Sequence, residues 1–488
     1  MRAAILAVMF LSGLGLSRLS SAVVRVGTHK QGIVGGTKFD GYEKSPFAQL
    51  TSSSCAAAAC HGGGHVGEVG SEYTTWAPDL QMEGPFDPHA KAYRVLFNAH
   101  SQTIARALNI PEAHKESLCL KCHAVEETQS GHAISEGVGC GACHGPAEKW
   151  LPEHTLAGWK SRSNREKEEL GFLPLSNLVT RSLTCAGCHV GDADREVNHD
   201  LIAAGHPRLS FVYTSFHFRS DYRHHWRERT PQPDFEVRAW VCGQAATLRA
   251  ATELLQQRAE RAVANHPKAV WPEFSGYSCF SCHQKIGAEN LQQGTGPAKR
   301  QAGVLGWELW SNTAAKVAAE VSDIAYPGVH KPDLHELDTL QKLMEKPIPI
   351  PKNIAVQAKR AVAELDVWLA ELHDADMRKG EYRIPADAPR QFVRELTRNA
   401  LSKDRLKLAN LDWDALNVNF LGCTAMYHAA GGYRTLPEWS APLSDLRVTL
   451  KFPLGFNGPT GFGAIERERV RKQFEELHKL TKRPGETP

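Results

Sequence analysis

Four copies of one short motif constrain this 488-residue chain more than any other feature. Cys-x-x-Cys-His occurs at residues 119–123, 140–144, 185–189 and 279–283. Residues i and i+3 share one face of a helix, so both thiols can add to one porphyrin, and the next histidine can ligate its iron. This spacing is the attachment signature of c-type haem. The sequence therefore predicts a chain that carries several covalent haems.

A stretched copy of the motif lies at residues 55–61, where four alanines separate Cys55 from Cys60 and His61 follows. Two thiols at this spacing can still reach one ring if the alanines bulge, so we expect a haem there; the alternative is two unrelated thiols. For the standard motifs the alternative is zinc, which Cys-x-x-Cys pairs also bind. A zinc site does not need a histidine after every second cysteine, so the repeated histidine favours haem.

The motifs together predict five haem c groups. The haem-binding cysteines are predicted to be Cys55, Cys60, Cys119, Cys122, Cys140, Cys143, Cys185, Cys188, Cys279 and Cys282. The predicted proximal iron ligands are His61, His123, His144, His189 and His283. Two cysteines remain, Cys242 and Cys423, and we expect them to pack as small apolar side chains and not as a disulfide.

Composition places the chain among soluble globular proteins. Hydrophobic residues make up 42% and charged residues 23%, which argues against disordered and membrane-embedded classes. The formal net charge is only +3, so nothing indicates a nucleic-acid partner. Residues 1–22 resemble a signal peptide, with Arg2 before an apolar run and a small-residue site ending at Ala22. We expect a periplasmic or otherwise exported protein with no transmembrane segment in the mature chain.

The hydrophobic pattern predicts a mainly α fold. Apolar residues recur at helical spacing over residues 88–108, 235–264, 354–372, 389–401 and 413–430. Between residues 119 and 206 we expect only short helices and loops, because buried haems would supply much of the apolar core. The predicted organisation is a signal peptide (1–22), a multihaem domain with four motifs (23–230), a long helix with the fifth motif (231–290) and a haem-free helical bundle (291–488).

Three local patterns resemble the cytochrome c-554 type of multihaem cytochromes, related to the haem core of hydroxylamine oxidoreductases. They are Asp-Pro-His-Ala-Lys-Ala-Tyr at residues 87–93, Gly-Val-Gly-Cys-Gly-Ala-Cys-His-Gly-Pro at 137–146, and the histidine that follows at position 154. The resemblance covers about a third of the chain. It implies stacked haem pairs, mostly bis-histidine ligation and electron transfer linked to nitrogen metabolism. The stretched first motif, the fifth motif and the C-terminal helices depart from the family pattern.

Eighteen histidines lie outside the motifs, and at most five can be distal ligands. The resemblance selects His89 and His154. His206 lies in a small-residue turn that would let a porphyrin approach the backbone. His199 and His100 are further predicted ligands, because His199 lies seven residues before His206 and His100 shares a helix face with His89. His224 and His225 lie in a basic aromatic run that is either a solvated loop or a set of haem-carboxylate or docking contacts.

Two functions remain open from the sequence. Bis-histidine haems have no open iron site, so a chain of them would transfer electrons between redox partner proteins, and no catalytic residue is predicted. The alternative is an oxidoreductase that acts on nitrite, hydroxylamine or nitric oxide at one five-coordinate haem. The C-terminal helices could also attach the cytochrome to a larger electron-transfer complex.

Overall fold

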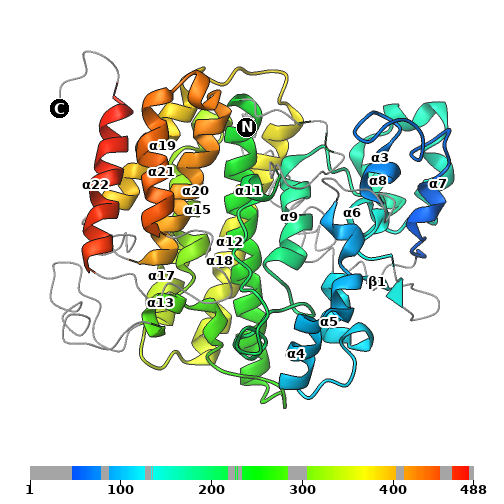
Figure 1. Cartoon of the computed structure of the whole chain (residues 1–488), viewed down its shortest axis with the longest axis horizontal. Helices are drawn as coiled ribbons and strands as arrows, with labels where there is room; N and C mark the ends of the chain where they lie inside the picture. The colour runs from blue at the N-terminus through cyan, green and yellow to red at the C-terminus, as the bar shows by residue number, and fades with distance from the viewer. Residues whose placement is uncertain are drawn as a thin grey trace, which may run out of the picture.

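The computed structural model describes most of the chain after residue 46, and its elements are mainly α-helical (Figure 1). The described residues are 47–77, 87–126, 133–134, 136–217, 226, 228, 233–283, 305–402, 412–450 and 464–482. The predicted signal peptide and the pair His224 and His225 lie outside them. Within these residues the strands are β1 (Val125–Glu126) and β2 (Ala133–Ile134), which pair antiparallel. None of the described helices has the length and apolar character needed to cross a membrane.

The four N-terminal motifs lie among short helices and 3₁₀ turns, most of which gather at one end of the molecule, while the last of them reach its centre (Figure 1). In chain order these elements are η1 (Ser52–Cys55), α3 (Glu72–Trp76), η2 (Pro88–Lys91), η3 (Arg94–Phe97), α4 (Ala99–Ala107), η4 (Ala113–Lys115), α5 (Ser117–His123), α6 (Cys140–His144), α7 (Trp150–Glu153), η5 (Ala157–Ser161), α8 (Asn164–Glu169), α9 (Leu178–His189), α10 (His199–Ala203) and α11 (Tyr213–His217).

The continuous helix predicted for residues 88–108 is wrong. The structure divides this segment into η2, η3 and α4. The start is as expected, since the Asp87 side chain accepts a hydrogen bond from His89 N and Pro88 occupies the first helical position. The break comes at Asn98, whose backbone is extended (φ −74°, ψ 164°) and whose side chain accepts from Ser101 N. Asn98 therefore caps a new helix, a local bond that competes with continuing the previous one.

From residue 233 onward the described chain contains longer helices, and the four helices predicted there are confirmed. They are α12 (Pro233–Val263), α18 (Pro351–Met377), α19 (Ala388–Leu401) and α20 (Trp413–Ala429). The other elements are η6 (Phe274–Gly276), α13 (Cys279–Cys282), α15 (Leu309–Glu320), α16 (Ser322–Ala325), α17 (His335–Met344), η9 (Gly432–Arg434), α21 (Pro437–Leu450) and α22 (Ala464–Leu480). After α20 the chain turns at Gly431, whose φ of +98° suits glycine.

Helix α12 is the centre of the main hydrophobic core. It packs against α9, α15 and α18, and Val237, Val241, Ala245 and Leu248 on it are fully buried. The core cluster runs from Leu178 on α9 to Leu477 on α22. It therefore spans the segments 231–290 and 291–488 and also includes the helix that ends at the fourth motif; the domain boundaries themselves stay a prediction.

Cys242 and Cys423 are both buried in this core as free thiols, as expected, and the Cys242 thiol lies 2.9 Å from the Tyr326 hydroxyl.

Candidate haem sites

Each standard motif has its two cysteines on one helical turn, at positions i and i+3. Helix α5 carries Cys119 and Cys122 and ends at His123, α6 consists of Cys140–His144, and α9 ends with Cys185, Cys188 and His189. Helix α13 is Cys279–Cys282, and His283 follows as its C-cap. All twelve cysteines are free thiols. Residues i and i+3 share one face of a helix, so this placement is compatible with attachment of both thiols to one porphyrin.

The stretched motif folds back on itself. Ala57 O accepts hydrogen bonds from Cys60 N at 2.8 Å and from Gly62 N at 3.1 Å. A Cβ on Gly62 would lie 1.9 Å from Ala56 O, so this tight turn requires glycine. His61 is held by Glu72 on α3, whose Oε2 lies 2.9 Å from His61 Nδ1. The alanines therefore form a tight turn that leads into Cys60 and His61.

Four of the motif histidines lie opposite a second histidine at one recurring distance. The ring centroids are 6.2 Å apart for His61 and His154, 6.1 Å for His189 and His89, 6.3 Å for His123 and His206, and 6.4 Å for His283 and His199. An iron between two imidazoles needs about 6 Å between centroids, because each metal–nitrogen bond takes about 2 Å and each ring adds about 1 Å. The four pairs therefore fit the two axial positions of a haem iron.

Hydrogen bonds on the outer nitrogens orient several of these rings. Nδ1 of His123 lies 2.9 Å from Ala92 O, Nδ1 of His206 lies 2.8 Å from Pro207 O, and Nδ1 of His154 bonds Leu151 O. A carbonyl oxygen can only accept, so Nδ1 carries the proton and Nε2 keeps its lone pair for a metal. Burial also lowers the pKa of His123 and of His206, which favours the neutral, ligating imidazole.

The remaining predicted ligands, His144 and His100, have other described contacts. The His144 ring stacks on Phe172 with centroids 5.8 Å apart. His100 Nε2 lies 3.0 Å from Gly205 O, next to His206. Gly205 has a φ of +116°, and a Cβ there would lie 3.4 Å from His100 Cε1. His100 therefore stabilises the turn that contains Gly205 and His206. Ligation of an iron by His100 stays a prediction.

Thiols of different motifs also meet. The Cys55 and Cys140 side chains lie close enough to shift each other's pKa, and so do those of Cys122 and Cys188. The first motif is therefore adjacent to the third, and the second to the fourth. Sequence spacing does not indicate these contacts, because the paired motifs are separated along the chain by more than sixty residues.

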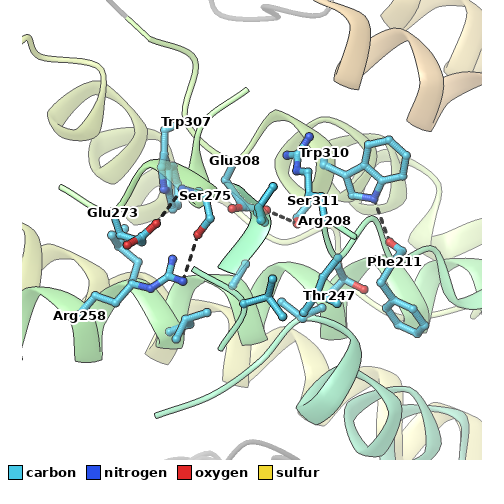
Figure 2. Close-up of a pocket in the computed structure, with 18 residues that line it drawn as sticks. Arg208, Phe211, Thr247, Arg258, Glu273, Ser275, Trp307, Glu308, Trp310 and Ser311 are labelled. Atoms are coloured by element: carbon cyan, nitrogen blue, oxygen red, sulfur yellow. Dashed lines mark hydrogen bonds between the residues drawn. The ribbon is translucent and has the colours of Figure 1, made fainter. Parts of the chain in front are cut away.

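A small cavity of about 50 Å³ lies between the fourth and fifth motifs (Figure 2). At one end Phe211 stacks on His189 with centroids 5.2 Å apart. At the other end Glu273 Oε1 accepts a hydrogen bond from His199 N at 2.8 Å. A volume of this size holds about one or two waters. The cavity, lined by both polar and apolar residues, thus lies between the neighbours of His189 and of His199.

Four charged side chains line this cavity, and the sequence predictions missed all of them: Arg208, Arg258, Glu273 and Glu308. Arg208 Nη1 donates to both carboxylate oxygens of Asp414 at 2.8 Å, and Arg258 Nε donates to Glu196 at 2.7 Å. Burial raises the pKa of Glu308, although Arg208 and Arg258 oppose that shift. No local sequence pattern marks these residues, because their partners lie far away along the chain.

Residues 81–145 match the family model of cytochrome c554 and c-prime. The matched segment contains the motifs at Cys119 and Cys140 and the paired histidine His89. This segment is of the cytochrome c554 type. A c-type cytochrome binds haem covalently and transfers electrons with redox partners. No curated protein and no solved structure matches the chain. The relationship to hydroxylamine oxidoreductase stays a prediction.

Proposed function

We propose that this c554-type protein is an exported electron carrier with five haem c groups. The observation that carries the proposal is the set of four histidine pairs with centroids 6.1–6.4 Å apart. Four haems would bind at Cys55/Cys60, Cys119/Cys122, Cys185/Cys188 and Cys279/Cys282, each between the two histidines of its pair. A fifth would bind at Cys140/Cys143 with His144 as proximal ligand.

When bound, a haem supplies a reversible one-electron couple. The protein residues determine the position of each haem in the fold. The two histidines of each pair would hold the iron from both sides, which leaves no open position for a substrate. The proximity of thiols of the first and third motifs, and of the second and fourth, supports short distances between neighbouring haems. This arrangement suits electron transfer between partner proteins, to which the C-terminal helices would attach.

The test is haem content together with low-temperature EPR of the oxidised protein. Five haems per chain with only low-spin signals would support the carrier. A stoichiometric high-spin signal would mean an open iron and would replace the proposal with the oxidoreductase that acts on a small nitrogen compound.

Paired substitutions test the individual sites. Cys279→Ser with Cys282→Ser should remove one haem, and Cys55→Ser with Cys60→Ser should remove another. If the second double variant keeps the full haem content, the stretched motif does not attach haem.

Export is tested on the same protein. If residues 1–22 are a signal peptide, the amino terminus of the mature protein should lie near Val23 and the haem-loaded protein should appear in the periplasmic fraction. An intact amino terminus on the haem-loaded protein would contradict cleavage.

A further inference from the structure

Two of the paired histidines are hydrogen-bonded to carboxylates. His61 Nδ1 lies 2.9 Å from Glu72 Oε2, and His89 Nδ1 lies 2.9 Å from Asp87 Oδ1. The Asp87 side chain is 4% exposed and the Glu72 side chain 25% exposed, so water screens neither interaction fully.

A third pair lacks this feature at both of its outer nitrogens. His123 Nδ1 and His206 Nδ1 each donate to a backbone carbonyl, of Ala92 and Pro207 respectively. Carbonyl acceptors carry no net charge. The structure therefore contains two classes of histidine pair. In one class, a charged carboxylate accepts the hydrogen bond from Nδ1 of one imidazole; in the other, neutral carbonyls accept from both imidazoles.

This difference has a direct electronic consequence. A carboxylate that accepts the Nδ1 proton makes the opposite nitrogen a more basic ligand than a neutral carbonyl does. A more basic ligand and a nearby negative charge both stabilise the oxidised, more positive iron. Second-shell hydrogen bonding of this kind is one of the means by which proteins set haem potentials.

We propose that Asp87 and Glu72 lower the reduction potentials of the haems at His89/His189 and His61/His154 below that of the haem at His123/His206. This inference rests on the proposed function. Because the Cys122 and Cys188 thiols lie close enough to shift each other's pKa, the second and fourth motifs are neighbours. Electron transfer from the fourth-motif centre to the second-motif centre is then downhill. The step moves one electron, oxidising the former and reducing the latter, with no change in bonds or protons.

This order of potentials sets the direction of electron flow through this part of the protein. A one-electron donor of low potential would reduce the fourth-motif centre, and an acceptor of higher potential would oxidise the second-motif centre. Asp87 and Glu72 contact histidines and not the iron, so both are positioning residues that act through His89 and His61.

The test is a redox titration of the full haem-loaded chain, followed by visible absorption and EPR. Asp87→Asn keeps an oxygen that can accept from His89 N and Nδ1 but removes the charge. We expect it to shift the midpoint potential of one haem upward and to leave the others in place. Glu72→Gln should shift a different haem upward, and Asp87→Glu, which restores the carboxylate, should return most of the first shift.

Glu153→Gln is the matched control. Glu153 directly precedes His154, but its carboxylate bonds Arg162 Nη2 at 2.6 Å. If Glu153→Gln shifts a potential as much as Glu72→Gln does, the contact with the imidazole is not the cause and the inference is overturned.

Unchanged potentials in Asp87→Asn and Glu72→Gln, at full haem content, would also overturn the inference while leaving the electron carrier intact. Missing haems or a high-spin iron in the unmodified protein would instead overturn the proposed function. If Asp87→Asn fails to retain its haems, Glu72→Gln decides the question at the other pair.

Discussion

Asp376 joins three separate elements of the core, and its removal should destabilise the fold strongly. Its side chain is fully buried at the end of α18 and accepts from Arg238 Nη1 on α12 at 2.6 Å. It also accepts from the Tyr326 hydroxyl at 3.2 Å and from Leu178 N, the first residue of α9, at 2.9 Å. One carboxylate thus connects the helix of the fourth motif to the C-terminal helices.

Asp376→Ala would leave the Arg238 guanidinium, which is only 7% exposed, with Asp234 as its remaining acidic neighbour. Breaking a buried ion pair by removing one partner typically costs about 3–5 kcal/mol. Asp234 is 60% exposed and 3.8 Å away, so its compensation should be weak. We therefore expect a loss of about 3–5 kcal/mol in the free energy of unfolding.

Urea denaturation followed by far-ultraviolet circular dichroism measures this loss as a lower midpoint. Asp338→Ala is the control, since Asp338 pairs with Lys316 at 2.5 Å but is 44% exposed. An exposed pair of this kind contributes about 0–1 kcal/mol. If Asp376→Ala lowers stability no more than Asp338→Ala, the buried carboxylate does not hold these helices together.

Two further predictions concern pH and backbone conformation. Burial raises the pKa of Glu236 on α12 to about 9, whereas an unfolded glutamate titrates near about 4.3. The folded state thus holds a proton that the unfolded state loses, so the free energy of unfolding should fall as pH rises from about 4.5 to 9. Urea midpoints measured across this pH range should fall less in Glu236→Gln. If the midpoints of the variant and of the unmodified protein fall in parallel, the prediction is wrong. Gly205→Ala should cost about 1–3 kcal/mol, because a φ of +116° strains any residue with a Cβ. It should also disturb the His206 turn and produce a high-spin EPR signal, whereas Gly158→Ala, where a Cβ meets nothing within 4 Å, should change neither measurement.

Local sequence determined those parts of the structure that depend on one stretch of chain. The period of apolar residues located α12, α18, α19 and α20, because a helix buries residues three and four apart on one face. It failed over residues 88–108, where the Asn98 side chain bonds the backbone and interrupts the pattern. The Cys-x-x-Cys-His motifs likewise act within one helical turn, so their spacing alone placed thiols and histidine together.

Only the tertiary structure decided which distant residues meet. His123 faces His206, and His283 faces His199, across more than eighty residues of chain in each case. Glu72 and Asp87, whose carboxylates contact His61 and His89, are near these histidines in sequence. Their proposed effect on haem potentials becomes visible only by comparison with His123, whose Nδ1 donates to a neutral carbonyl. Cys122 meets Cys188, and Asp376 meets Arg238 and Leu178, because the helices that carry them pack together. Such contacts depend on the burial of whole helix faces, which no local pattern specifies.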